Sequence, residues 1–484
     1  MRLPSDSARS PAFNVRLSCD MADAALKFIA SFQAALGSPV PSSPVTLSDG
    51  GSLPSVFAVS DLAQASIATA GSSLASFVAL NSGEPPPEVV VDRNLASAWF
   101  VGSIRPQGWD LLPAWDALGG EYECRDGWIR LHTNAIHHRT AALSVLDVPE
   151  DRAAVAAAAG AWSAQELETA VVGAGGAAAV MRSIADWRMH PQGRAVAEEP
   201  LLWSQRTSTV VGRNALLANR ERPLDGLRVL DLTRVLAGPV ATRLLAGWGA
   251  EVLRIDPPDW DEPAIAPEVT LGKRCARLNL RTPDGKSRLL RLLGSADVIV
   301  HGYRADALDR LGLGDEARDN VCPGIIDVSL DAYGWTGPWR QRRGFDSLVQ
   351  MSSGIADAGR VVTGDERPVP LPVQALDHAV GYLLAAAVIT GLTQRQIDGT
   401  GSRWRTSLAR VADLLVKVEP LQVPIDSSRP PMTPNPVGPI ERTVWGDALR
   451  LAPPVVVQGA PLQWKLPARR LGSDRPQWLG GDNE

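Results

Sequence analysis

The chain has 484 residues, of which 45% are hydrophobic and 21% are charged, as in an ordinary globular protein. The net charge is −5 and no block of Lys and Arg stands out, so the composition gives no indication of a nucleic-acid partner. The N-terminus has no clean apolar signal segment, and the apolar run 381–392 is too short to cross a bilayer. We therefore expect a cytoplasmic protein that binds neither nucleic acid nor membrane.

The cysteines and histidines give no sign of a metal centre. The four cysteines stand at 19, 124, 275 and 322 without a C-x-x-C pair, and the six histidines form no H-x-x-x-H motif. We expect buried free thiols and no bound metal.

The front of the chain predicts two units. Residues 1–104 carry two apolar helices, at about 22–36 and 61–80, with a Ser- and Pro-rich loop between them. Residues 105–206 predict a small domain, in which a strand at 127–131 follows an Asp-Gly turn and Ala-rich helices follow at about 151–162 and 164–184. The polar stretch 207–224 is predicted to be a linker.

Residues 225–415 show the clearest pattern. Strands are predicted at 228–232, 251–255, 297–300 and 324–330. One helix is predicted to begin at Gly238-Pro239, a second at Thr282-Pro283, and a third spans about 378–393. Strands that alternate with helices predict an α/β fold, with a doubly wound parallel sheet in the large domain and a second, smaller α+β domain. The Pro-rich tail, 416–484, is expected to pack as an extended return segment.

The chain also contains a weak internal repeat. Asp61 begins an apolar helix that ends near Gly83, and Asp377 begins another that ends near Gly399. The offset is the same at both ends (377 − 61 = 316 and 399 − 83 = 316). Common origin explains this spacing, and so does chance similarity between two Ala-rich helices.

The first β-α-β unit, 228–256, raises the question of a dinucleotide site, because Asp256 stands where a ribose-binding acid would. Its loop reads Thr-Arg-Val-Leu-Ala-Gly-Pro (233–239) and lacks the three-glycine fingerprint that lets a pyrophosphate approach the backbone. A nicotinamide-dependent dehydrogenase is therefore not favoured.

A series of motifs follows along residues 230–338. They are Leu-Asp-Leu-Thr-Arg-Val-Leu-Ala-Gly-Pro (230–239), Arg-Ile-Asp-Pro (254–257), Gly-Lys-Arg (272–274), Thr-Pro-Asp-Gly (282–285), Asp-Val-Ile-Val (297–300), Leu-Asp-Arg-Leu-Gly (308–312) and Tyr-Gly-Trp-Thr-Gly-Pro (333–338). Together these motifs resemble the family III CoA-transferases, the family of formyl-CoA transferase, carnitine CoA-transferase and the related racemases. The resemblance covers about 224–415 and is specific because the motifs keep their order. It implies an enzyme that moves coenzyme A between carboxylic acids, with an acyl-CoA and a carboxylic acid as its small-molecule partners.

Coenzyme A carries a diphosphate and a 3′-phosphate, which fixed cations near strand ends can bind. The candidates are Arg254, Lys273, Arg274, Arg304 and Arg310. The resemblance adds Tyr303, and it implies that the backbone of Val235, Leu236 and Ala237 contacts the adenosine end or the pantetheine arm. Any one of these charges could instead be an ordinary solvated side chain.

The resemblance places the catalytic nucleophile at Asp377, at the start of a long Ala-rich helix. A carboxylate can attack a thioester carbonyl to give a mixed anhydride, and the released thiolate can return to form an aspartyl-CoA thioester. The alternative is that Asp377 is an N-cap. Asp61, its counterpart in the repeat, has no cofactor site upstream and is not expected to act.

The chain departs from the family pattern in several places. The racemases have a His where this chain has Phe345, which cannot move a proton, and His378 is expected to be structural. The family's small domain resembles 121–194, so the chain reads as two tandem copies that lost reciprocal parts. The glycine-rich flap of the family is reduced to Gly119-Gly120, which weakens the expected shielding from water.

Three functions stay open. The first is a CoA-transferase, the second is an isomerase, racemase or lyase of CoA esters, and the third is a non-catalytic partner that binds CoA esters. Because the family forms interlocked dimers, the resemblance also implies a homodimer.

Overall fold

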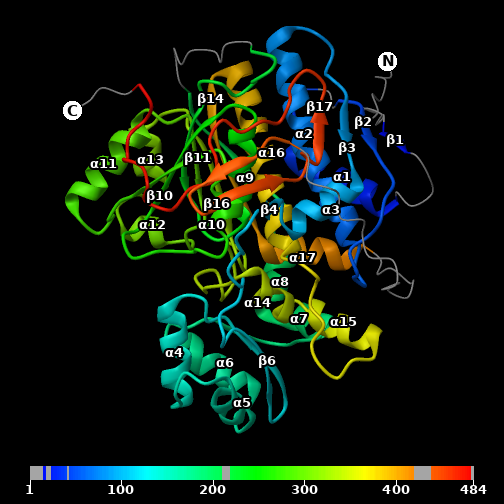
Figure 1. Cartoon of the computed structure of the whole chain (residues 1–484), viewed down its shortest axis with the longest axis vertical. Coiled ribbons are helices and arrows are strands. Elements are labelled where there is room, and N and C mark those ends of the chain that lie inside the picture. The colour runs from blue at the N-terminus through cyan, green and yellow to red at the C-terminus, as the bar shows by residue number, and fades with distance from the viewer. Residues whose placement is uncertain (1–14, 18–22, 41–42, 210–218, 419–437, 481–484) are drawn as a thin grey trace, which may run out of the picture.

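The computed structural model describes residues 15–17, 23–40, 43–209, 219–418 and 438–480. These residues form sheets of seven, four, three and three strands. The two larger sheets stand on either side of a central layer of long helices, and a small domain projects from one end of the molecule (Figure 1).

The seven-stranded sheet has the order β11-β10-β9-β12-β13-β14-β8. The strands are β8 Trp203–Thr209, β9 Arg228–Leu232, β10 Glu251–Asp256, β11 Lys273–Arg277, β12 Val298–His301, β13 Ile326–Asp331 and β14 Thr400–Ser407. All pair in parallel except β8, which lies antiparallel at the edge. The chain runs outward from β9 to β11 and then outward on the other side from β12 to β14. The doubly wound α/β prediction is confirmed, and the strand order reverses between β9 and β12.

Helices cover both faces of this sheet, among them α9 (Ala237–Gly247) and α16 (Ala375–Asp398) on one face and α11 (Pro283–Gly294) on the other. The large domain also contains α10 Ala266–Val269, α12 Ala307–Arg310, α13 Asp315–Val321 and α17 Leu408–Lys417, while α14 (Asp346–Ser352) and α15 (Ile355–Thr363) pack toward the small domain and α7. Val229 joins the core that contains α9 and α16, whereas its neighbour Leu230 joins the core on the side of α11. Both faces are buried, and the central strands combine apolar residues with buried charged residues, among them Asp231, Arg254 and Asp327.

Residues 15–101 form a second parallel unit. It consists of β1 Val15–Leu17, α1 Asp23–Leu36, β2 Val45–Leu47, α2 Val59–Ser82, β3 Val89–Val91 and α3 Arg93–Val101. β1, β2 and β3 pair in parallel, and β17 (Val455–Val457) from the tail pairs antiparallel with β3. The β-α-β-α-β order is that of one half of a doubly wound sheet.

The internal repeat is visible in the structure. α2 and α16 each have 24 residues, and both of their ends differ by 316 in number. Each ends at a left-handed glycine, Gly83 at φ 71° and Gly399 at φ 72°. The antiparallel edge strands are exchanged between the halves, since β8 extends the rear sheet and β17 extends the front sheet.

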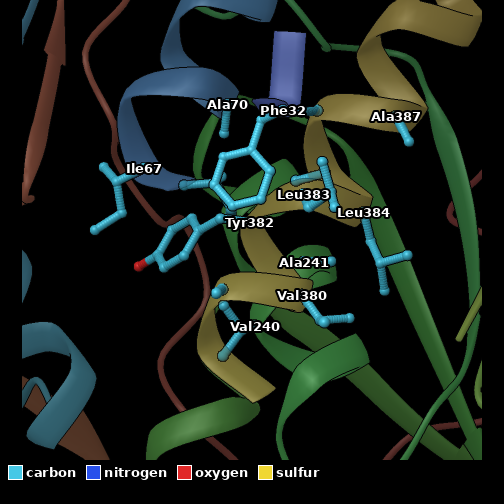
Figure 2. Packing of buried hydrophobic residues seen from close by; sticks show 14 of the residues in the cluster. Phe32, Ile67, Ala70, Val240, Ala241, Val380, Tyr382, Leu383, Leu384 and Ala387 are labelled. Atoms are coloured by element: carbon cyan, nitrogen blue, oxygen red, sulfur yellow. The ribbon is translucent and has the colours of Figure 1, made fainter. Parts of the chain in front are cut away.

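α2 and α16 pack against each other at the centre of the molecule, with α1 and α9 against them. Figure 2 shows Phe32 of α1 and Tyr382 and Leu383 of α16 within this core. A β-carbon at Gly381 would lie 2.5 Å from the carbonyl oxygen of Ala237, so α16 approaches α9 this closely because residue 381 is glycine. By length and composition α2 and α16 could cross a membrane, but 89% and 100% of their apolar windows are buried inside the protein.

The small domain has its own apolar core. It contains the antiparallel strands β5 Gly120–Cys124, β6 Gly127–Leu131 and β7 Ala178–Val180, and the helices α4 Ile136–Leu146, α5 Arg152–Gly160 and α6 Ala164–Gly173. α7 (Ile184–Met189) and α8 (Pro191–Glu198) lead back to the large domain. The helix predicted over 164–184 ends at Gly173, because Gly175 has a φ of +85° and the following residues pair with β6.

The described part of the tail, 438–480, runs as an extended segment with short strands. β15 (Glu441–Thr443) and β16 (Gly446–Arg450) form a sheet with β4 (Ile104–Pro106). Trp478 then packs on the core beside α11. Cys124, Cys275 and Cys322 are buried, while Cys19 lies outside the described residues, as do residues 210–218 of the linker and residues 419–437.

Candidate active site

The loop after β9 lies at the carboxyl edge of the sheet, where the strand order reverses. Val235 in this loop has a φ of 63°, a left-handed conformation that is strained for a β-branched residue. Its N–H donates to Oε2 of Glu262 over 2.9 Å. The loop that precedes Leu236 and Ala237 is thus held in a fixed, costly shape, as expected for backbone that contacts a ligand.

Arg254 holds this loop in place through Glu262. Its side chain is fully buried and pairs with Asp256 over 2.9 Å and with Glu262, the acceptor of the Val235 N–H. Burial opposes the charge, but Glu262 and Asp256 raise the pKa of Arg254 well above its ordinary value. We therefore revise its predicted role from phosphate binding to positioning of the loop.

Lys273 and Arg274 also differ from their predicted role. The Lys273 ammonium is fully buried, and it donates to Oδ2 of Asp231 over 3.0 Å and to the carbonyl of Pro239 over 2.9 Å. Arg274 donates to the carbonyl oxygens of Gln477 and Arg475 in the tail. Both residues begin β11, at the end opposite the carboxyl edge. Their partners are protein groups, so we revise both assignments from cofactor binding to structural roles.

Tyr303 and Arg304 follow β12 at the carboxyl edge, as predicted from the sequence. Arg304 donates to the carbonyl of Gln341 over 3.2 Å. Arg310 lies on α12 with 64% of its side chain exposed and pairs with Asp306 one turn earlier. Of the five predicted cations, Arg304 is the one that combines the correct edge with the absence of a carboxylate partner among the described residues.

Two further arginines lie in the same region, and the sequence analysis did not assign them. The Arg234 guanidinium lies 4.9 Å from the ring of Trp260 and 5.4 Å from the ring of Tyr303. Arg343 donates to the carbonyl of Gly175 in the small domain over 2.8 Å. Burial and the neighbouring charge of Arg304 lower the pKa of Arg343. Within the described residues, neither Arg234 nor Arg343 forms an ion pair with a carboxylate. In the sequence, Arg234 could have been found from its place in the 230–239 motif, and Arg343 from the Arg-Arg pair that precedes Gly344.

Asp377 is buried near the start of α16, two residues after its first residue, Ala375. The N-cap position belongs to Gln374, so the interpretation of Asp377 as an N-cap does not hold. The Asp377 N–H donates to Oδ2 of Asp346 over 2.9 Å, and Gln350 donates to the other oxygen of Asp346. Burial and the adjacent Asp346 carboxylate raise the pKa of Asp377 well above its ordinary value, and burial also raises the pKa of Asp346.

Asp61 has a different environment at the equivalent point of α2. Arg93 binds it through two hydrogen bonds of 2.9 Å, and both side chains are buried. The helices that follow, α3 and α17, have Asp92 and Ser407 as their N-caps, and the residue after the cap is Arg93 in α3 but Leu408 in α17, so α17 has no cation at that position. Asp61 is therefore a neutralised structural residue, whereas Asp377 has a second carboxyl group as its neighbour.

The small domain reaches the same region through Phe345, the residue before Asp346. The His132 ring stacks on Phe345 with the ring centroids 3.7 Å apart. Gly119 donates its N–H to Asp116 over 2.7 Å, and Gly120 begins β5 directly. His378 stacks on Phe100 inside the core, and burial lowers the pKa of His378 to about 3, in keeping with a structural role.

The large domain thus has arginines without carboxylate partners among the described residues at its switch point, and a buried carboxyl group, Asp377, near the start of its central helix. The family model of CoA-transferase family III matches residues 224–444, and this segment belongs to that family. The resemblance predicted from the motifs is confirmed.

Individual relatives agree with this assignment. Rv3272 of Mycobacterium tuberculosis, a probable fatty acyl-CoA transferase, is 32% identical over 209 residues, which make up 40% of this chain and 52% of that protein. The succinyl-CoA:glutarate CoA-transferase of Mus musculus is 35% identical over 43% of this chain and 49% of that protein. The succinyl-CoA–D-citramalate CoA-transferase of Chloroflexus aurantiacus is 33% identical over 37% of this chain and 48% of that protein.

A crystal structure of Rv3272 matches with a TM-score of 0.36 at 33% identity, over 40% of this chain and 55% of that one. The chain spans about half the length of the curated relatives it matches.

Proposed function

We propose that the protein transfers coenzyme A between carboxylic acids and that Asp377 is the nucleophile. The observation that carries this proposal is the contrast between the two equivalent aspartates. Asp61 is bound by Arg93, whereas no cation among the described residues pairs with Asp377. A buried carboxylate without a cation is costly to the fold, and a chemical role explains why it is present.

The proposed reaction proceeds in two symmetrical halves. The ionised Asp377 attacks the carbonyl carbon of the acyl-CoA thioester, the C–S bond breaks, and a mixed anhydride and CoA thiolate result. The thiolate attacks the aspartyl carbonyl, which releases the first carboxylate and leaves an aspartyl-CoA thioester. The acceptor carboxylate then reverses these steps and departs as the new acyl-CoA, so Asp377 is regenerated without a net change of protons or electrons.

The CoA phosphates are proposed to bind Arg234, Arg304 and Arg343 at the carboxyl edge. Their support is that all three lie at or beside the switch point without a carboxylate partner in the described chain. The strained backbone at Val235, followed by Leu236 and Ala237, is proposed to contact the adenosine end or the pantetheine arm. Aromatic rings at Trp260 and Tyr303 lie against Arg234 and keep its guanidinium in place.

Two alternatives remain within the family. An isomerase, racemase or lyase would need a proton-transfer group, and a non-catalytic protein would bind CoA esters without forming a bond to Asp377. Gly120 is the first residue of β5 and Gly119 precedes it directly. This short segment is expected to shield the reacting thioester from water less than a glycine-rich flap would. A cytoplasmic location and the absence of metal, nucleic acid and membrane partners stay predictions.

The resemblance implies a homodimer, but for this chain we propose that the protein is a monomer in solution. The support is the exchange of edge strands between the two halves and the packing of α2 on α16 inside one chain. The two halves thus already form the kind of paired arrangement that two copies would otherwise supply.

Intact-protein mass spectrometry tests the function directly. The protein is incubated with a panel of acyl-CoAs, and hydroxylamine is added to trap the aspartyl anhydride or aspartyl-CoA thioester as a hydroxamate. A hydroxamate at Asp377 excludes the non-catalytic binder. The absence of any adduct with every acyl-CoA, together with normal CoA affinity, would contradict transferase activity.

A further inference from the structure

The loop 332–345 connects β13 to α14 through turns and irregular backbone. It carries Arg342 and Arg343 next to each other, and Arg343 is one of the arginines proposed to bind the CoA phosphates. Arg304, another of these arginines, donates to the carbonyl of Gln341 in the same loop. Ordering a loop costs conformational entropy, so contacts from outside the loop must hold its ligand-binding side chain in place.

The first part of this loop is held by side chains from the segment that returns from the small domain. Gln192 in α8 donates to the carbonyl oxygens of Tyr333 and Thr336 over 2.9 Å each. It also accepts the N–H of Trp339 over 2.6 Å. Glu199, directly after α8, accepts the N–H of Thr336 over 2.8 Å. This part of the loop is therefore fixed through its backbone.

The second part is held by Glu168, a carboxylate of the small domain that is only 2% exposed. Glu168 lies on α6, and its Oε1 is 3.0 Å from Nη2 of Arg342. Arg182 binds the same carboxylate through hydrogen bonds of 2.8 and 3.2 Å. Burial opposes the charge, but the hydrogen bond from Arg182 and the charges of Arg342 and Arg182 lower the pKa of Glu168 to about 2. Glu168 is therefore ionised at neutral pH.

Further contacts fix Arg342 in this position. Its guanidinium lies 3.9 Å from the centre of the Trp339 ring, and it donates to the carbonyl of Ala178 in β7 over 2.7 Å. The neighbouring Arg343 donates to the carbonyl of Gly175 and has no carboxylate partner among the described residues. Of two adjacent cations, the fold thus neutralises Arg342 and leaves Arg343 for an anionic ligand.

Other positive charges surround Arg343. Burial lowers the pKa of Arg343, and the charge of Arg304 lowers it further. Burial also lowers the pKa of His137, and the charges of Arg343 and Arg234 lower it further. An anion bound at Arg343 relieves this repulsion, provided that the loop holds the guanidinium at a fixed place.

We propose that Glu168 is a positioning residue for CoA, which fixes the loop through Arg342 so that the adjacent Arg343 is held toward the cofactor phosphates. This inference rests on the proposed binding of the CoA phosphates by the arginines at the carboxyl edge. Glu168 acts on Arg342, and Arg342 acts on Arg343 through the peptide bond that joins them. Because Glu168 is not proposed to touch the cofactor, its substitution is expected to affect recognition of the phosphates and not of the pantetheine arm.

Calorimetry with CoA and with pantetheine tests this proposal, because pantetheine lacks the adenosine and all phosphates of CoA. Glu168→Gln removes the charge and keeps an oxygen that can accept from Arg182. Arg342→Met removes the same contact from the other side and leaves Glu168 paired with Arg182. Each variant is expected to weaken CoA binding by roughly tenfold, the effect of losing a hydrogen bond to a charged group, with unchanged affinity for pantetheine.

A double variant identifies the route of the effect. Arg343→Ala and Glu168→Gln/Arg343→Ala are expected to bind CoA equally, because Glu168 acts only through Arg343. Glu166→Gln is the matched control, since it makes the same change on α6 at an exposed side chain that pairs with Arg125. It is expected to leave both affinities unchanged. Thermal unfolding identifies a folding defect, and Arg342→Met keeps the test valid if Glu168→Gln fails to fold.

An equal loss of CoA and pantetheine affinity in both single variants overturns the proposal, because Glu168 would then only hold the domains together. Unchanged CoA affinity in both variants overturns it too, as do additive losses in the double variant. Wild-type CoA affinity in Arg343→Ala contradicts the phosphate site and this inference with it. Failure of CoA transfer is distinguished from these results, because binding of CoA needs no reaction: the expected affinities without an adduct at Asp377 support the positioning role and contradict only the transfer.

Discussion

Asp61 and Arg93 form a buried ion pair with two hydrogen bonds of 2.9 Å each, and in the rear half of the chain α17 has Leu408 at the position that Arg93 holds in α3, directly after the N-cap. The same aspartate position therefore carries a paired carboxylate in α2 and one without a cation partner in α16. This difference separates a structural aspartate from a candidate nucleophile.

The first prediction concerns covalent labelling. Asp377→Ala is expected to abolish both the aspartyl-CoA adduct and CoA transfer, because the substitution removes the carboxylate that is proposed to attack the thioester. Asp61→Ala is expected to retain the adduct in the folded fraction. Mass spectrometry of both variants with a reactive acyl-CoA checks this, and an adduct that survives in Asp377→Ala but vanishes in Asp61→Ala would reverse the assignment.

The second prediction concerns stability. Arg93→Ala leaves the Asp61 carboxylate buried without a cation and is expected to lower the free energy of unfolding by about 3–5 kcal/mol. The double variant Asp61→Leu/Arg93→Leu removes both charges and is expected to lose less. Urea unfolding of the two proteins measures the difference, and equal stability of wild type and Arg93→Ala would show that the pair contributes nothing.

The third prediction concerns pH. Burial and the Asp346 carboxylate raise the pKa of Asp377, and the nucleophile must be ionised, so kcat/KM is expected to rise with pH through this raised pKa. Asp346→Asn removes the neighbouring charge but keeps an oxygen that can accept the Asp377 N–H. The rising limb is therefore expected to move to lower pH. Because the two carboxyls titrate together, the profile reports the pair, and an unchanged limb in Asp346→Asn contradicts their coupling.

The fourth prediction separates binding from structural cations. Arg304→Ala and Arg343→Ala are each expected to weaken CoA binding by about 1–3 kcal/mol without a large change in stability. Lys273→Ala leaves the buried Asp231 carboxylate without its cation, so it is expected to lower the free energy of unfolding by about 3–5 kcal/mol instead. Calorimetry with CoA and thermal unfolding give the two readouts. Arg291→Ala, which changes a side chain on α11 bonded to Ser287, is the control.

The fifth prediction concerns assembly. Light scattering is expected to give the mass of one chain, 51.5 kDa, because α2 and α16 already pack together within it. A mass of two chains at micromolar concentration would restore the homodimer implied by the family resemblance.

The amino-acid sequence by itself determined the fold class and the order of the large domain. The strands at 228–232 and 127–131 were predicted with the bounds they have, because apolar runs between turn residues are a local signal. The helix around Asp377 extends further than predicted, from 375 to 398, since its ends are less apolar than its middle. The offset of 316 between α2 and α16 was also visible in the sequence.

The tertiary structure decided which charged side chains have a partner of opposite charge. In the sequence, Arg254, Lys273 and Arg304 look alike, since each stands near a strand end. In the fold, Glu262 and Asp231 take up the first two, while Arg304 faces the switch point without a carboxylate partner among the described residues. Asp231 lies 42 residues before Lys273 on another strand, and Glu262 lies 8 residues after Arg254 in the loop that follows β10, so neither contact follows from a helix or strand periodicity. The same holds for Asp61 and Asp377. Arg93, 32 residues after Asp61, binds Asp61 in the front half, whereas α17 in the rear half begins with Leu408 at the corresponding position.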